Sequence, residues 1–122
     1  MDTGDAAWVM ISAALVLFMT PGLALFYGGM DRTKNVLNML MMNFWCLLVI
    51  PVVWVVIGYS ISGQHPDDFA NKYLGSFDFA FLKGMGISGE DGGGVLITMV
   101  FLGMFAVITP ALISGAVADR MK

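Results

Sequence analysis

The stretch NVLNMLMMNFWCLLVIPVVWVVIGYSISGQ, residues 35–64, contains no Asp, Glu, Lys or Arg. Two further stretches without these residues flank it, AAWVMISAALVLFMTPGLALFYGGM at 6–30 and GGGVLITMVFLGMFAVITPALISGAVA at 92–118. A helix that crosses a bilayer needs about 20 mostly apolar residues, and all three stretches are longer. Backbone polar groups in lipid are satisfied only in helices or closed barrels, and three segments cannot close a barrel. The sequence therefore predicts an all-α membrane protein with transmembrane helices at about 6–30, 35–62 and 92–118.

The composition agrees with this fold class. Hydrophobic residues make up 58% of the chain and charged residues 12%, and the mean hydropathy is +0.82. These values exclude a soluble domain and a disordered tail. The lipid bilayer is therefore the first partner that the sequence predicts.

The placement of charge predicts an orientation. The basic residues that flank the predicted spans at short connections are Arg32, Lys34, Arg120 and Lys122. Lys and Arg near the ends of spans favour the cytoplasmic side. The N-terminal end carries only acids, Asp2 and Asp5. We therefore expect a multi-pass protein of the cell membrane, with the N-terminus and the 63–91 loop outside, and the 31–34 turn and C-terminus in the cytoplasm.

The spans carry little reactive chemistry. Cys46 is the only cysteine and His65 the only histidine, and no ionisable acid or base lies within a span. Catalytic sets, metal sites and proton relays need several such groups together. No basic patch supports binding of nucleic acid. We expect no enzyme activity, no cofactor, no metal site and no nucleic-acid partner.

Polar and aromatic side chains within the spans suggest contacts between helices. Asn38 and Asn43 are predicted to form hydrogen bonds between helices, because amides are costly to leave unpaired in lipid. Trp54 lies near the outer end of its span, where interfacial aromatic residues are common. Phe101 and Phe105 are four residues apart and share one helix face. Their spacing alone is compatible with packing or with the lining of a pore.

Several strings resemble the N-terminal part of the ammonium transporter family, which is related to the Rhesus proteins. They are TPGLALFYGGM at 20–30, KNVL at 34–37, GYS at 58–60, FAVITPALISGA at 105–116 and DRMK at 119–122. The resemblance covers nearly the whole chain in order and spacing and is weakest in the loop. It implies that residues 1–122 form part of an eleven-helix ammonium transporter fold, with an external N-terminus and a homotrimeric assembly.

The resemblance also implies a substrate path for ammonium or ammonia. Phe105 matches the outer of two stacked gating phenylalanines, and Phe101 matches an aromatic position beside the external recruitment site. Leu102 stands where many bacterial members have glutamine. The paired pore histidines, the second gating phenylalanine and other site residues of the family belong to later helices. The chain therefore resembles a fragment that contains the first three helices.

Energetics indicate that these aromatic residues alone do not carry ammonium across the membrane. Moving an unpaired cation out of water costs on the order of tens of kcal/mol. One cation–π contact returns only about 0.5–2 kcal/mol. Three helices, each about 10 Å across, also pack without leaving a central channel. We expect no conduction by this chain alone unless it oligomerises.

Two other functions remain compatible with the sequence. One is a membrane ammonium sensor or regulator built on the same fold. The other is a small stand-alone membrane protein that assembles with larger partners. No signalling domain is recognisable within the 122 residues, so the sequence does not favour the sensor over transport.

Overall fold

The computed structural model describes residues 1–63, 75–83, 92–118 and 120. Within these ranges the chain is helical and has no strand. Its elements are α1 (Thr3–Met30), α2 (Val36–Val53), η1 (Trp54–Gly58), α3 (Tyr59–Ser62), η3 (Ala80–Leu82) and α4 (Gly92–Val117). The elements α2, η1 and α3 form one continuous helix. Three helices are thus long and apolar enough to cross a membrane, Thr3–Met30, Val36–Ser62 and Gly92–Val117, which confirms the predicted fold class.

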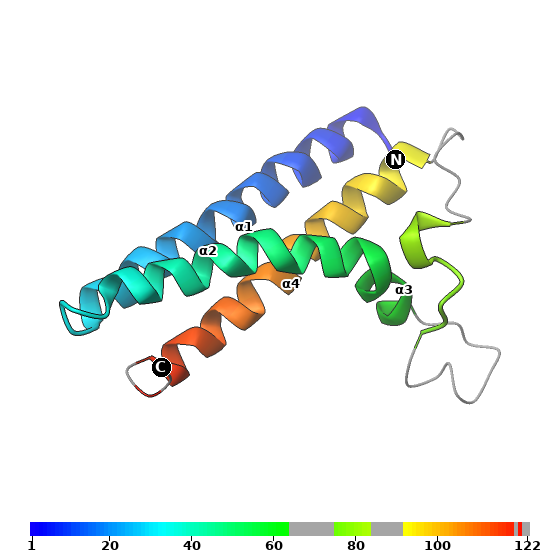
Figure 1. Cartoon of the computed structure of the whole chain (residues 1–122). Coiled ribbons are helices and arrows are strands. Elements are labelled where there is room, and N and C mark those ends of the chain that lie inside the picture. Colours follow the sequence, from blue (N-terminus) through cyan, green and yellow to red (C-terminus); the bar gives the residue numbers. More distant parts are fainter. Residues whose placement is uncertain (64–74, 84–91, 119, 121–122) are drawn as a thin grey trace.

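The three long helices pack against one another (Figure 1). Helices α1 and α2 run antiparallel, joined by the turn at 31–35, and α4 crosses both of them (Figure 1). The N-terminus lies beside the first turn of α4, and the C-terminal end of α4 lies at the end of the bundle that holds the turn (Figure 1). Successive long helices therefore alternate in direction.

Helix α1 begins before the uncharged stretch because a side chain caps it. The carboxylate of Asp2 accepts a hydrogen bond of 2.8 Å from the backbone N–H of Thr3. Acidic residues at this end also interact favourably with the helix dipole. The helix then continues through Pro21 and ends at Met30, where the N–H of Asp31 donates to the carbonyl of Tyr27.

The second long helix changes its winding after Pro51 and does not end there. Residues Trp54–Gly58 form a π-helical turn, in which the N–H of Tyr59 donates to the carbonyl of Trp54 five residues earlier. Such turns insert an extra residue and redirect the side chains that follow. The helix turns at this point in Figure 1 and ends at Ser62.

A short segment after this helix is tied to its end. The hydroxyl of Ser60 donates to the carbonyl of Ser76 at 2.5 Å and accepts from the N–H of Phe79 at 3.1 Å. The N–H of Gly75 donates to the carbonyl of Ile61. The described part of the 63–91 loop is therefore held at the end of the bundle that carries the N-terminus. The rest of the loop, with His65, lies outside the described residues.

Small side chains form much of the contact between helices. Ala24 and Ala111 are almost completely buried, at 1% and 0% exposure. At Gly115 of α4 the backbone meets the ring of Tyr27 so closely that a Cβ atom there would lie 2.6 Å from its Cζ. Small residues allow this approach, which in lipid is a main source of helix association.

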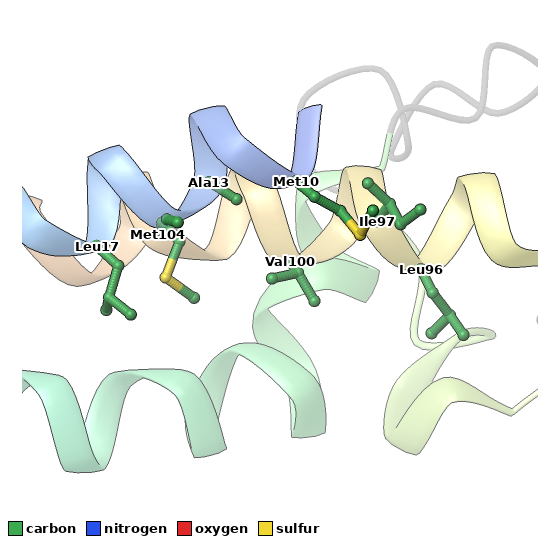
Figure 2. Close-up of a pocket in the computed structure, with 8 residues that line it drawn as sticks. Met10, Ala13, Leu17, Leu96, Ile97, Val100 and Met104 are labelled. Carbon is green, nitrogen blue, oxygen red and sulfur yellow. The ribbon is translucent and has the colours of Figure 1, made fainter. Parts of the chain in front are cut away.

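A groove of about 370 Å³ remains between α1 and α4 nearer the N-terminus (Figure 2). Its lining is apolar throughout: Met10, Ala13, Ala14, Leu17, Leu96, Ile97, Val100 and Met104. The two helices thus touch closely near Gly115 and leave space near Ala13.

The two asparagines of α2 differ. Asn43 is fully buried, and its Nδ2 donates to the carbonyl of Met39 at 2.9 Å and to the hydroxyl of Ser114 on α4 at 3.2 Å. The predicted bond between helices is confirmed for Asn43. Asn38 is exposed among the described residues, so a bond between helices stays a prediction for this residue.

Candidate functional site

The candidate site lies on α4, where Phe101 and Phe105 form an aromatic pair. Their ring centroids are 5.2 Å apart and their planes meet at 81°, an edge-to-face arrangement. This geometry places the positive edge of one ring on the negative face of the other and is favoured for aromatic pairs. One helical turn separates the two residues, as their spacing predicts.

Phe105 lies on the face of α4 that no other described element covers. Its side chain is 45% exposed, whereas Phe101 is half-buried. Exposed residues recur along this face at helical spacing: Thr98, Leu102, Phe105, Thr109, Leu112 and Ala116. We call this set the open stripe of α4. It is apolar except for two threonines.

The opposite face of α4 is buried against α1 and α2. It includes Met99, Gly103, Val107, Ala111 and Ser114. Helix α4 is therefore packed on one side only, and Phe105 lies on the other side. An exposed apolar stripe of this length faces lipid, further helices or a path across the membrane.

The backbone beside the aromatic pair has an irregular hydrogen-bond pattern. The hydroxyl of Thr109 donates to the carbonyl of Phe105 at 2.8 Å. Pro110 has no N–H, so the carbonyl of Ala106 lacks its usual donor four residues later. The carbonyl oxygen of Ala106, next to Phe105, is thus an acceptor without its helical donor. Helix α4 nevertheless continues past Pro110 to Val117.

The chemistry of this site is that of π faces and backbone oxygens. The described residues contain no group of three or more His, Cys, Asp or Glu side chains that could hold a metal. The aromatic faces attract cations. The site suits a small cation or a neutral molecule that donates hydrogen bonds.

Sequence reasoning placed Trp54 at the membrane interface, and the structure shows a further role for it. Its indole Nε1 donates to the carbonyl of Met99 on α4 at 3.1 Å. A Cβ atom at Gly103 would lie 2.8 Å from its Cδ1. Gly103, two residues from each phenylalanine, was the available signal, because a glycine inside a span often marks close helix contact.

Comparison with known proteins identifies the family. A family model described as the Ammonium Transporter Family matches residues 7–122. An ammonium transporter of Aquifex aeolicus is 43% identical over 124 residues, which cover 100% of this chain and 29% of that protein. One of Bacillus subtilis is 42% identical over 127 residues, covering 100% of this chain and 30% of that protein.

A third relative gives the same result. An ammonium transporter of Mycobacterium bovis is 46% identical over 138 residues, which cover 99% of this chain and 28% of that protein. The chain therefore spans less than a third of the length of these relatives. Because both the family model and the relatives cover almost all of its residues, and because three membrane-spanning helices underlie the match, the chain belongs to the ammonium transporter family.

Proposed function

We propose that this chain supplies the first three membrane helices of a transporter or channel for ammonium or ammonia. Its membership of the ammonium transporter family supports the substrate. The bundle supports different roles for the two faces of α4, because α1 and α2 pack against one face and leave the other face open. The open stripe is then the surface that meets the remaining helices and the substrate path.

Phe105 is proposed as the outer gate of that path, with Phe101 beside the external recruitment site. The observation that carries this proposal is the exposure of Phe105 on the open stripe, together with its edge-to-face contact with Phe101. A ring held at its edge by a neighbour keeps its bulk in one place. Such a ring can close a narrow path to water and attract a cation at its face.

The proposed orientation places the N-terminus outside. Arg32 and Lys34 belong to the turn after α1, and Arg120 follows the C-terminal end of α4. The turn and the C-terminal end of α4 lie at the same end of the bundle (Figure 1). Asp2 and Asp5 lie at the opposite end. The excess of basic residues at the turn supports its cytoplasmic location. The resemblance further supports an eleven-helix subunit in a homotrimer.

A hybrid transporter tests the site. Residues 1–122 replace the matching segment of the Bacillus subtilis relative, and uptake is measured in cells without their own ammonium transporters. Phe105→Ala should change the rate of uptake or the ratio of ammonium to methylammonium, per molecule at the membrane. Phe105→Leu retains bulk and removes the ring, so it separates steric closure from cation–π attraction.

Phe18→Ala is the matched control, because Phe18 is 73% exposed on α1 and belongs to no part of the open stripe. It should leave uptake per molecule unchanged. If both Phe105 variants behave like the unmodified hybrid, Phe105 is not part of the path. If both variants fail to reach the membrane while Phe18→Ala does, Phe105 is a packing residue.

A further inference from the structure

Trp54 contacts α4 on the side opposite the aromatic pair. Two residues along a helix correspond to a rotation of about 200°, so Phe101 and Phe105 both lie nearly opposite Gly103. The indole of Trp54 covers Gly103 from the buried side. A residue in this position can set where the two rings stand without touching them.

The contact between Trp54 and α4 fixes more than one degree of freedom. The bond from its Nε1 to the carbonyl of Met99, 3.1 Å long, fixes the position of α4 along its axis. The close approach at Gly103, where a Cβ atom would lie 2.8 Å from the indole Cδ1 and 3.0 Å from Nε1, fixes the distance between helices. Met99 and Gly103 are one turn apart on the buried face, so the indole spans that turn.

The indole itself is held from its own helix. Trp54 is the first residue of the π-helical turn, and a Cβ atom at Gly58 would lie 2.9 Å from its Cε3. The ring of Tyr59 meets it edge to face, with centroids 6.0 Å apart and planes at 73°. The widened turn and the two glycines therefore accommodate a large flat side chain between helices.

We infer that Trp54 is a positioning residue for the substrate path, which sets the aperture at Phe105 by fixing the height and distance of α4. This inference rests on the proposed function of Phe105. According to this inference, the π-helical turn of the second span, which begins at Trp54, contributes to substrate selectivity. Methylammonium, which is larger than ammonium, is the probe most sensitive to such an aperture.

The test uses the hybrid transporter and three variants. Trp54→Phe keeps an aromatic ring and removes the N–H, and Gly103→Ala adds a methyl group against the indole. Each should change the ratio of methylammonium to ammonium uptake by about three- to tenfold, the scale of one lost hydrogen bond. In the double variant Gly103→Ala with Trp54→Phe, the smaller ring makes room for the added methyl group, so the change should be less than the sum of the two single effects.

Trp45→Phe is the matched control, because Trp45 is 60% exposed on α2, and it should leave the ratio unchanged. If Trp54→Phe and Gly103→Ala lower only the amount of protein in the membrane, with the ratio per molecule unchanged, Trp54 is a packing residue and the inference is overturned. If Phe105→Ala alters the ratio and Trp54→Phe does not, only this inference fails. If neither Phe105→Ala nor Trp54→Phe changes uptake by the hybrid, the proposed path itself is contradicted.

Discussion

At the scale of single residues, Asn43 shows how a polar side chain orders an apolar bundle. It is fully buried, and its Nδ2 bonds to Met39 of its own helix and to Ser114 of α4. Its Oδ1 has no partner within the described part of the chain. The hydroxyl of Ser114 also donates to the carbonyl of Ala111 at 2.6 Å. The amide therefore connects α2 to a chain of bonds on α4, and it does so with only its donor side.

Removal of this amide should weaken the bundle by a measurable amount. Asn43→Ala loses the bond to Ser114 and leaves a small cavity, so we expect a loss of about 1–2 kcal/mol, since bonds between membrane helices average about 0.6 kcal/mol and reach about 1.7. Asn38→Ala on the same helix should change stability by less than about 0.5 kcal/mol, because that side chain is exposed. Thermal unfolding of the purified hybrid in detergent measures both. Equal effects of the two substitutions would show that the bond to Ser114 contributes nothing.

The sequence predicts some of these residues and not others. The spacing of Phe101 and Phe105 predicts a shared face, because four residues complete about one turn in any helix. The sequence does not show which of Asn43 and Asn38 is buried, since a helix that is apolar all round has no polar face to set its rotation. For the same reason, the sequence does not show that Trp54 points toward α4. Only contacts with the other helices separate these cases.

At the scale of elements, the contact between α1 and α4 depends on a glycine. The ring of Tyr27 lies against Gly115, and its hydroxyl donates to the carbonyl of Leu112 at 3.4 Å. Ala24 and Ala111, both buried, lie on the same two helices. One aromatic ring and several small side chains thus set the separation of the two helices near the turn.

An added methyl group at this contact should force the helices apart. In Gly115→Ala the new Cβ would lie 2.6 Å from the Cζ of Tyr27, and such overpacking costs about 1–3 kcal/mol. Gly22→Ala is the control, because its added Cβ would have no heavy atom within 4 Å apart from its chain neighbours and the nearby backbone of its own helix, and a helical Gly→Ala change gains about 0.5–1 kcal/mol. The melting temperature of the hybrid should fall in the first variant and not in the second. A fall of equal size in both would contradict the close contact.

Element lengths follow from the sequence more closely than element details do. The uncharged stretches predict three long helices because only helices satisfy the backbone in lipid. The sequence does not predict that α1 begins at Thr3, because this depends on the capping bond from Asp2. Nor does it predict the π-helical turn after Pro51, since the sequence alone does not show that Trp54, the first residue of this turn, meets α4.

At the scale of the whole molecule, the alternation of the helices leads to a prediction of topology. Once Cys46 is replaced by serine, a membrane-impermeant thiol reagent should label Thr3→Cys in intact cells. It should label Thr33→Cys only after the cells are opened, because the proposed orientation places the basic turn in the cytoplasm. Both positions are exposed in the structure, so access within the bundle does not limit labelling. Labelling of Thr33→Cys in intact cells would reverse the orientation.

The most direct measurement is the initial rate of ammonium uptake in cells that lack ammonium transporters, at low ammonium and acidic pH. The hybrid with residues 1–122 in place of the matching segment of the Bacillus subtilis relative should restore uptake. The 122 residues expressed alone should not, because three helices leave the open stripe of α4 without the helices that complete a path. If the hybrid reaches the membrane in the same amount as the relative and gives no uptake, the proposed function is contradicted. If the 122 residues alone give uptake that matches that of the relative, the proposal that further helices complete the path is contradicted.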